Sequence, residues 1–347
     1  MSDPDAPALG RWLTAHLPGP DGPPGLTRIG GGQSNPTWFV DWGAHRLVLR
    51  KKPGGPILPG AHAMEREYRV LRALESTAVP VPRALWLEED AGVLGTPFYV
   101  MERLEGRVFD DAALPGVDPA QRGAMYMDVA RTLARLHAVR PDAVGLGDYG
   151  RPGNYFARQI ARWTRQYAAA EMPRIAALDR LVDWLPAHMP PDDGATAIAH
   201  GDFRIGNMMF HPTEPRVIAV LDWELSTLGH PLADLGYCVM PWHSAPDEYG
   251  GLKGTDWRTA GIPERDAFVA EYMAEAARLG HPTAPLRPFH IAFAMFRFAV
   301  IFVGIAERAR AGSAASAEAA SLGPLAERFA IRACEVIDTE TGGEGSA

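Results

Sequence analysis

The chain has 347 residues, of which 47% are hydrophobic and 22% are charged, and its formal net charge is -8. This composition is that of an ordinary globular protein with a sizeable core, and the acidic balance argues against a nucleic-acid partner, which needs a basic stripe. Two cysteines, Cys238 and Cys334, are present without any C-x-x-C, so neither a disulfide framework nor a zinc knuckle is expected.

The first residues, MSDPDAPALG, lack the basic and apolar segments of a secretory signal. The longest apolar stretch, residues 289–306, carries Arg297 in its middle, which favours a buried helix over a membrane span. We therefore expect a cytoplasmic protein with no membrane partner.

The first hundred residues predict a sheet-rich N-terminal part, residues 1–103. Apolar spacing predicts helices over residues 5–18 and 61–75. Alternation predicts strands over residues 37–41, 46–52, 83–87 and 97–101. The turn Trp42-Gly43-Ala44 should join the first two strands, and a glycine-containing turn the last two.

The remainder, residues 104–347, is mostly helical. Helices are predicted over residues 121–139, 156–170, 175–188, 264–279, 286–310 and 314–337, and strands over residues 197–199, 208–210 and 217–221. Because strands and helices are segregated along the chain, the fold class is predicted to be α+β.

The stretch IAHGDFRIGNMMF places polar residues between two strand-like runs. Asp202 and Asn207 have the D-x-x-x-x-N spacing of a kinase catalytic loop, and His200 precedes the aspartate by two residues. A carboxylate can accept the proton of an attacking hydroxyl, and an amide oxygen can bind Mg²⁺ without adding charge. An Asx-rich turn is the alternative.

Asp222 follows the apolar run at residues 217–221, at the end of a predicted buried strand. A carboxylate there must be hydrogen-bonded or must bind a ligand, because burying it bare is costly. Asp222 is therefore a second candidate Mg²⁺ ligand beside Asn207, unless it only caps the following turn.

A glycine-rich loop, RIGGGQSNPTWFV, precedes the first strand of the predicted hairpin. Backbone N–H groups at Gly31 and Gly32 can approach phosphates closely, and Ser34 and Asn35 can add side-chain donors. The loop is neither G-x-G-x-x-G nor a Walker loop, so an ordinary flexible turn remains open.

The next strand, RLVLRKK, ends in three basic residues. Arg50 is the first candidate to hold nucleotide phosphates, with Lys51 and Lys52 as alternatives. On the helix predicted over residues 61–75, Glu67 falls inside the apolar stripe and Glu65 near its edge, so Glu67 is the better ion-pair partner for Arg50.

The segment FYVMERLEG passes from the last predicted strand to the helical part. In a two-lobed kinase this segment is the hinge, where backbone groups pair with adenine. Glu102 and Leu104 are therefore candidate nucleotide-binding residues, although other strand-to-helix linkers look similar.

These strings, together with LARLH and VLDWELSTLGHPLADLGY, resemble the aminoglycoside phosphotransferase-like family within the protein-kinase-like fold. The nearest resemblance is to the kinase-like domains associated with acyl-CoA dehydrogenases. It implies a small β-rich N-lobe, a larger helical C-lobe, ATP as donor, Asp202 as the base, and Asn207 and Asp222 as Mg²⁺ ligands.

The chain departs from the family pattern at two candidate positions. Arg50 stands where many relatives have lysine, and Arg204, in the catalytic loop with His200, stands where relatives often have histidine. Arginine keeps the charge of lysine but not its point-like geometry. Asp234 is expected to brace the loop through backbone N–H groups.

Only 11 residues separate Asp222 from Asp234, too few for a protein-kinase activation segment. The acceptor is therefore expected to be a small hydroxylated molecule, by analogy a hydroxyacyl or other lipid-derived metabolite rather than an aminoglycoside. Candidate lining is MPWHSAPDEYG, with Glu271, Tyr272 and Arg297. A catalytically silent nucleotide-binding regulatory module and a metal-dependent hydrolase are the alternative functions.

Overall fold

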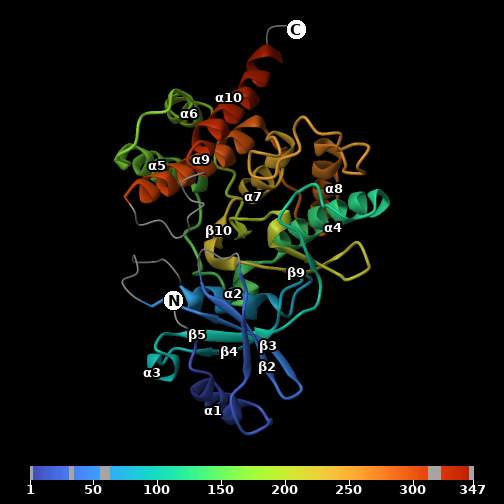
Figure 1. Ribbon diagram of the computed structural model, residues 1–347. Coiled ribbons are helices and arrows are strands. Elements are labelled where there is room, and N and C mark those ends of the chain that lie inside the picture. Colours follow the sequence, from blue (N-terminus) through green and yellow to red (C-terminus); the bar gives the residue numbers. More distant parts are fainter. Residues whose placement is uncertain (1–2, 31–34, 55–62, 312–321, 344–347) are drawn as a thin grey trace. The chain divides into compact units, whose positions relative to one another are not determined.

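The computed structural model describes residues 3–30, 35–54, 63–311 and 322–343 (Figure 1). It divides into two compact units: Met1–Gly106 with Ala219–Glu224, and Arg107–Ile218 with Leu225–Ala347. The first unit thus takes in a short segment beyond the sheet-rich part. The lobe boundary expected between residues 103 and 104 stays a prediction.

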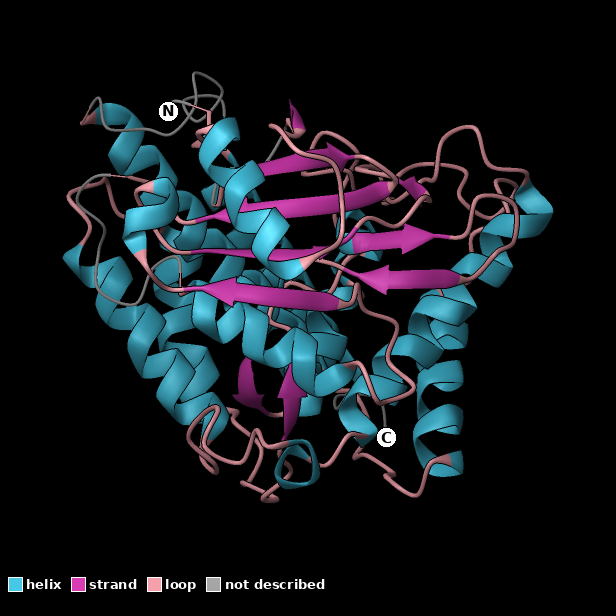
Figure 2. Ribbon diagram, turned by 90° about the horizontal axis from the view of Figure 1, so that it is seen from below, coloured by secondary structure: helices cyan, strands magenta, loops and turns pink. Residues whose placement is uncertain are grey.

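The first unit is built on an antiparallel sheet with strand order β1-β2-β3-β5-β4 (Figure 2). Its strands are β1 (Gly25–Arg28), β2 (Thr37–Trp42), β3 (His45–Lys51), β4 (Ala84–Glu88) and β5 (Phe98–Glu102). Trp42 pairs with His45, so the hairpin turn is shorter than predicted. Gly43 adopts φ +58°, a conformation that glycine reaches without strain.

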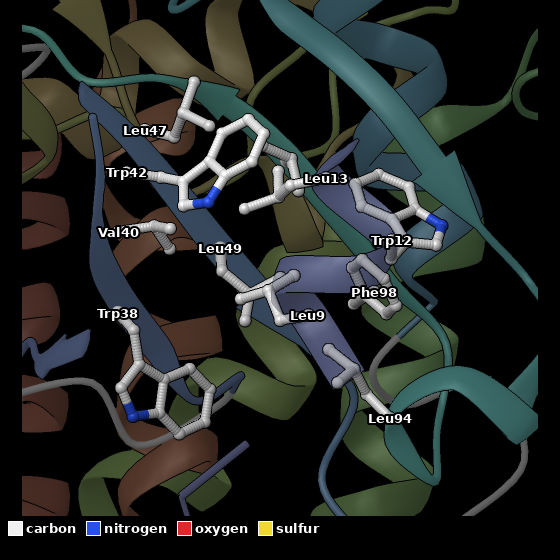
Figure 3. Packing of buried hydrophobic residues seen from close by; sticks show 11 residues of the cluster. Leu9, Trp12, Leu13, Trp38, Val40, Trp42, Leu47, Leu49, Leu94 and Phe98 are labelled. Carbon is white, nitrogen blue, oxygen red and sulfur yellow. The ribbon is translucent and has the colours of Figure 1, made fainter. Parts of the chain in front are cut away.

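Helix α1 (Ala6–His16) packs against one face of this sheet. Figure 3 shows Leu9 and Leu13 of α1 gathered with Trp42, Leu49 and Phe98 of the strands. Alternation along β3 sends Leu49 to this core and Arg50 to the opposite face. The helix of that opposite face, α2 (Met64–Leu74), pairs with Arg50.

The connection between β4 and β5 is more ordered than the glycine-containing turn expected there. It contains a short helix, α3 (Ala91–Leu94), whose first turn is capped by the Asp90 side chain. Gly95 ends the helix in the left-handed conformation.

The second unit holds the larger helices. They are α4 (Pro119–Ala138), α5 (Tyr155–Ala169), α6 (Ala176–Ala187), α7 (Pro231–Cys238), α8 (Arg265–Arg278), α9 (Pro288–Arg310) and α10 (Leu325–Gly343). Helix α9 is in contact with α5, α6, α7 and α10, and Figure 1 shows α10 lying alongside it. Helix α9 is long and apolar enough to cross a membrane, but 72% of its most apolar stretch is buried, as expected of a core helix.

Short strands connect these helices. β7 (Ala197–Ala199) pairs with β10 (Thr227–Gly229), and β6 (Arg107–Val108), β8 (Met208–Phe210) and β9 (Val217–Val220) form a second small sheet. Beyond α3, the prediction missed β1, β6, β10 and α7. The strands are too short to show alternation, and α7 is buried on all sides and has no amphipathic period.

Helix α10 begins at Leu325, whereas a helix from residue 314 was predicted. Residues 314–321 lie outside the described part of the chain. Residues 322–324 form turns and end in Pro324, which suits a position before a helix rather than inside one. The predicted fold class, α+β with a sheet-rich part and a helical part, is confirmed.

Candidate active site

The predicted catalytic loop follows β7 directly and leads into β8 through a short 3-10 turn, Ile205–Asn207. Gly201 adopts φ +83°, and a Cβ at this position would lie 2.8 Å from the carbonyl oxygen of Leu225. A larger residue would therefore be both strained and in collision. The chain reverses at Gly201, and Asp202 follows the reversal.

Asp234 of α7 fixes the backbone of this loop, as the sequence predicted. Its carboxylate accepts hydrogen bonds from the amides of His200 at 2.6 Å and Gly201 at 2.9 Å. Burial by itself would raise the pKa of Asp234, but His137, His200 and the Gly201 amide hold it below its usual value. The charged form is therefore stable in the interior.

His200 contributes to the loop from inside the protein. It has no exposed surface, and its Nδ1 accepts the backbone N–H of Asp202 at 3.1 Å. The ring lies edge-on to Phe203. These contacts orient the residue that follows.

Three side chains surround the Asp202 carboxylate. Nδ2 of Asn207 donates to Oδ2 at 2.7 Å and to the Asp202 carbonyl at 2.8 Å. The hydroxyl of Tyr237 donates to Oδ1, and Nε of Arg204 lies 3.6 Å from Oδ2. The two predicted loop residues are thus brought together with a third, Tyr237, that sequence reasoning missed.

A sequence signal for Tyr237 exists. It lies three residues after Asp234, so one face of α7 carries both side chains toward the same loop. Burial and the neighbouring Asp202 carboxylate raise the pKa of Tyr237 well above its usual value. Its hydroxyl therefore remains a proton donor to Asp202.

Within the first unit, Arg50 is the centre of a polar cluster. Its Nη1 lies 3.0 Å from Glu67, and its Nη2 lies 2.9 Å from Asp222 and 3.9 Å from Glu224. Tyr99, which is paired with Arg50 in the sheet register, hydrogen-bonds Glu67. The predicted Arg50–Glu67 pair is therefore present.

The charges of this cluster perturb one another. Burial raises the pKa of Glu67 to about 7, although the Arg50 guanidinium opposes the shift. Burial would lower the pKa of Arg50, but Glu67, Tyr99 and Asp222 raise it above its usual value. Arg50 stays charged, and Glu67 keeps its proton to a higher pH than an exposed glutamate does.

Asp222 follows β9 in a conformation with φ +63°, which non-glycine residues adopt rarely and aspartate more readily than most. Its side chain is 33% exposed. A sparsely populated backbone conformation at a strand end is a common feature of functional positions. Asp222 belongs to the first unit and Asn207 to the second.

The remaining nucleotide-side predictions differ in how far the structure describes them. Gly31, Gly32 and Ser34 lie outside the described residues. Asn35 is 4% exposed, and its carbonyl accepts the Thr37 hydroxyl at 2.9 Å.

The predicted hinge begins where β5 ends. The carboxylate of Glu102 accepts the Arg83 amide at 2.8 Å, and Leu104 lies beyond the strand, partly exposed. The side chain of Glu102 is thus bound to a neighbouring strand end.

A cavity of about 50 Å³ lies in the second unit beside the catalytic loop. Its lining includes Tyr126, Arg204, Tyr237, Tyr249, Phe298 and Phe329. Five residues of the predicted acceptor segment contribute to it, namely Met240, Pro241, Ser244, Tyr249 and Gly250.

Three other residues expected to line the acceptor site are not part of this lining. Glu271 pairs with Arg131, and Tyr272 is fully buried against His137. Arg297 lies near the rings of Trp163 and Tyr237. The acceptor roles of these three residues stay predictions.

The sequence of this chain is similar to those of known proteins over most of its length. The model of the phosphotransferase enzyme family matches residues 25–286. Acyl-CoA dehydrogenase family member 10 of Mus musculus is 43% identical over 92% of this chain, which spans only 30% of that relative's length. The whole relative therefore contains much that this chain does not match.

Solved structures agree with the fold. A protein of Ralstonia eutropha, described as a candidate aminoglycoside phosphotransferase, is 46% identical with a TM-score of 0.86, covering 97% of this chain and 99% of its own. A thermostable mutant of an aminoglycoside phosphotransferase, in ternary complex with AMP-PNP and hygromycin B, is 15% identical with a TM-score of 0.60, covering 94% and 98%. At that identity the likeness shows the fold alone.

Proposed function

Because the chain belongs to the phosphotransferase enzyme family, we propose that it transfers the γ-phosphoryl group of ATP to a hydroxyl group of a small molecule. The observation that carries this proposal is the Asp202 carboxylate, bonded by Tyr237 and Asn207 on a loop fixed by Asp234. AMP-PNP in a solved structure of the same fold supports ATP as the donor.

In the proposed reaction the acceptor oxygen forms a bond to the γ-phosphorus, and the bond from that phosphorus to its bridging oxygen breaks. ADP leaves, and the hydroxyl proton passes to Asp202. Tyr237 and Asn207 hold the carboxylate in one orientation, which raises the fraction of encounters in which it faces the hydroxyl. His200 and Asp234 keep the backbone in place.

Asn207 and Asp222 are the proposed Mg²⁺ ligands. Among the described residues, both hydrogen bonds of the Asn207 side chain are made by Nδ2, so its Oδ1 is available to bind a metal ion. The described residues contain no group of three or more His, Cys, Asp or Glu side chains suited to a metal. Two oxygen ligands suit Mg²⁺, which keeps several waters and binds phosphates; when bound, it neutralises phosphate charge.

Arg50 is the proposed phosphate-binding cation. Its Nε is buried and has no hydrogen-bond partner among the described residues, whereas both terminal nitrogens are paired. A phosphate oxygen would satisfy that donor. Glu67 would orient the guanidinium.

The nucleotide roles proposed for the glycine-rich loop and for the hinge rest on the sequence. The loop residues are Gly31, Gly32, Ser34 and Asn35, and the hinge residues are Glu102 and Leu104.

For the acceptor, we propose a hydroxyacyl or other lipid-derived molecule rather than an aminoglycoside. The cavity beside Asp202 has mostly apolar and aromatic walls, and its cation is Arg204. Burial lowers the pKa of Arg204, but Tyr249 and Asp202 raise it further, so the side chain stays charged. Asp110 lines the same cavity, so the described lining carries one charge of each sign rather than the acidic cluster that a polycation needs. The dehydrogenase relative supports an acyl compound.

ATP consumption by the purified protein with Mg²⁺ tests the proposal, measured against hydroxy acids, hydroxyacyl thioesters, sugars, choline, macrolides and aminoglycosides. Acceptor-dependent turnover should fall by about 10²–10⁴-fold in Asp202→Asn, through loss of the base. Asp183→Asn, at an exposed position on α6, is the matched control and should retain turnover.

Equal turnover in wild type and Asp202→Asn would refute the role of Asp202. Nucleotide binding without turnover on any acceptor would favour a catalytically silent regulatory module. Hydrolysis of substrates without ATP would point to a metal-dependent hydrolase instead.

A further inference from the structure

Tyr249 has an unusual backbone conformation, with φ +66°. Bulky side chains rarely adopt positive φ, and the cost is on the order of 1–3 kcal/mol unless the surroundings impose it. The residue is 45% exposed, so burial in the core does not explain the conformation.

The residue before it is held by the C-terminal helix. Glu248 is 3% exposed and accepts hydrogen bonds from Arg328 at 3.0 Å, from Arg332 at 2.9 and 3.0 Å, and from the Ala245 amide at 2.7 Å. Burial alone would raise the pKa of Glu248, but these partners hold it below its usual value. Two arginines of α10 thus fix the position preceding Tyr249.

The residues after Tyr249 close the loop tightly. Gly250 has φ +74°, and a Cβ at Gly251 would lie 2.0 Å from the carbonyl oxygen of Ser244. The Gly251 amide donates to Ala245 at 3.1 Å. The loop is therefore determined on both sides of Tyr249, which explains how the strained conformation persists.

The ring of Tyr249 lies at the cavity beside the catalytic loop. Its centroid is 5.1 Å from the ring of Phe298 and 5.8 Å from that of Phe302, both edge-on. The guanidinium carbon of Arg204 lies 5.4 Å from the same ring, within the range of a cation–π contact. Tyr237, which bonds Asp202, lines the cavity too.

We propose that Tyr249 determines acceptor specificity, its ring forming a fixed wall against which the apolar part of the acceptor packs. This inference rests on the proposed function and adds the residue that selects among acceptors. Glu248, Arg328 and Arg332 hold the backbone of this wall, and Phe298 and Arg204 contact its ring. The ring therefore limits the room for a bulky substituent, and the proposal predicts that unbranched acceptors bind better than branched isomers. The strain is retained because an immobile wall discriminates better than a mobile one.

The test uses pairs of straight-chain and branched hydroxy carboxylic acids with the full chain. Calorimetry without ATP gives the ratio of dissociation constants for each pair, and ATP consumption gives the ratio of kcat/KM. Wild type should prefer the straight isomer, and Tyr249→Gly should reduce that preference by about tenfold, the scale of one apolar contact. The change should appear in acceptor affinity and acceptor KM, not in the KM for ATP.

Two controls accompany it. Tyr249→Phe keeps the ring and should keep the preference, whereas Ile331→Ala, at an exposed position on α10, should behave as wild type. Glycine relieves the strain at positive φ but loses the ring contacts with Phe298 and Phe302. The Tm of Tyr249→Gly is therefore measured to establish that the variant is folded at the assay temperature, which separates lost selectivity from unfolding.

An unchanged ratio in Tyr249→Gly would overturn the inference, and so would wild-type protein that binds neither isomer or both equally. Loss of preference in the calorimetry with no ATP turnover in wild type would support selection by Tyr249 while refuting the proposed phosphoryl transfer.

Discussion

Two buried carboxylates, one in each unit, behave in opposite ways. Glu67 and Asp234 are both 2% exposed. Burial raises the pKa of Glu67 to about 7, whereas the pKa of Asp234 is held below its usual value despite burial. Burial alone therefore does not decide the charge of an acidic side chain.

The partners explain the difference. Asp234 accepts two backbone N–H groups and lies 3.5 Å from His137, with no other carboxylate among these partners. Glu67 shares the Arg50 guanidinium with Asp222 and Glu224, whose negative charges raise its pKa further. Fixed amide donors stabilise a buried charge more than a cation that several carboxylates share.

The largest loss of stability should follow removal of the Asp234 carboxylate, which is stabilised by fixed backbone N–H donors. Asp234→Ala leaves the amides of His200 and Gly201 buried without an acceptor, so the free energy of unfolding should fall by about 3–5 kcal/mol. Turnover should fall too, because the loop carrying Asp202 loses its brace. Urea denaturation measures the free energy of unfolding. A loss below about 1 kcal/mol would contradict the claim that the amide donors stabilise the Asp234 charge more than Arg50 stabilises that of Glu67.

Glu67 should give the stability of the protein a pH dependence that the variant Glu67→Gln lacks. Its ordinary pKa is 4.5 and its folded value is about 7, so between these pH values the folded state holds a proton that the unfolded state has released. Stability supplied by Glu67 is therefore complete below pH 4.5 and is lost as the pH rises to 7. Glu67→Gln should gain stability relative to wild type, on the order of 2 kcal/mol from pH 5 to 8.

The paired comparison removes other titrating groups. Burial lowers the pKa of His243 to about 4 and that of His290 to about 3, so both stabilise less as the pH falls below 6.5. They act equally in wild type and Glu67→Gln, and their contribution cancels in the difference. If Glu67→Gln instead loses stability relative to wild type as the pH rises, the attraction of Arg50 for the charged carboxylate must exceed the cost of burying that charge.

Replacing the shared cation tests the other side of the comparison. Arg50→Lys keeps the charge, but one ammonium group cannot reproduce the two contacts that the guanidinium makes with Glu67 and Asp222. The free energy of unfolding should fall by about 1–2 kcal/mol, and the KM for ATP should change while the acceptor KM does not. The control is Arg180→Lys, at an exposed position. If both variants have the same KM for ATP, Arg50 lies outside the nucleotide site.

Sequence reasoning recovered these centres unequally. The Arg50–Glu67 pair could be found because Arg50 is the first basic residue after an apolar strand and the helical period places Glu67 in an apolar stripe. The bond from Asp234 to the loop could be found because the family resemblance implies it. The roles of Tyr99 and Tyr237 were missed, because aromatic residues are common in cores and only the tertiary register shows which hydroxyl meets a polar group. Tyr249 lies in the predicted acceptor segment, but its backbone conformation was not predicted.

The acceptor region shows the same limit. Five residues of the segment at 240–250 line the cavity, yet Glu271 and Tyr272 proved to be occupied elsewhere. The strain at Tyr249 has no signal in the sequence, because neighbouring glycines, not the tyrosine itself, suggest a left-handed turn. The contacts of the buried Glu248 carboxylate with two partly exposed arginines of α10 join residues about eighty positions apart.

The smallest effects should come from the two tyrosine hydroxyls that bond the carboxylates of each unit. Tyr99→Phe removes a hydrogen bond to Glu67, and Tyr237→Phe removes one to Asp202. Each should lower the free energy of unfolding by about 1 kcal/mol, the usual net value of a hydrogen bond. Only Tyr237→Phe should also lower kcat, by about tenfold, because its partner is the proposed base. Denaturation and steady-state kinetics on both variants distinguish the roles; equal kcat in the two would leave Tyr237 a purely structural residue.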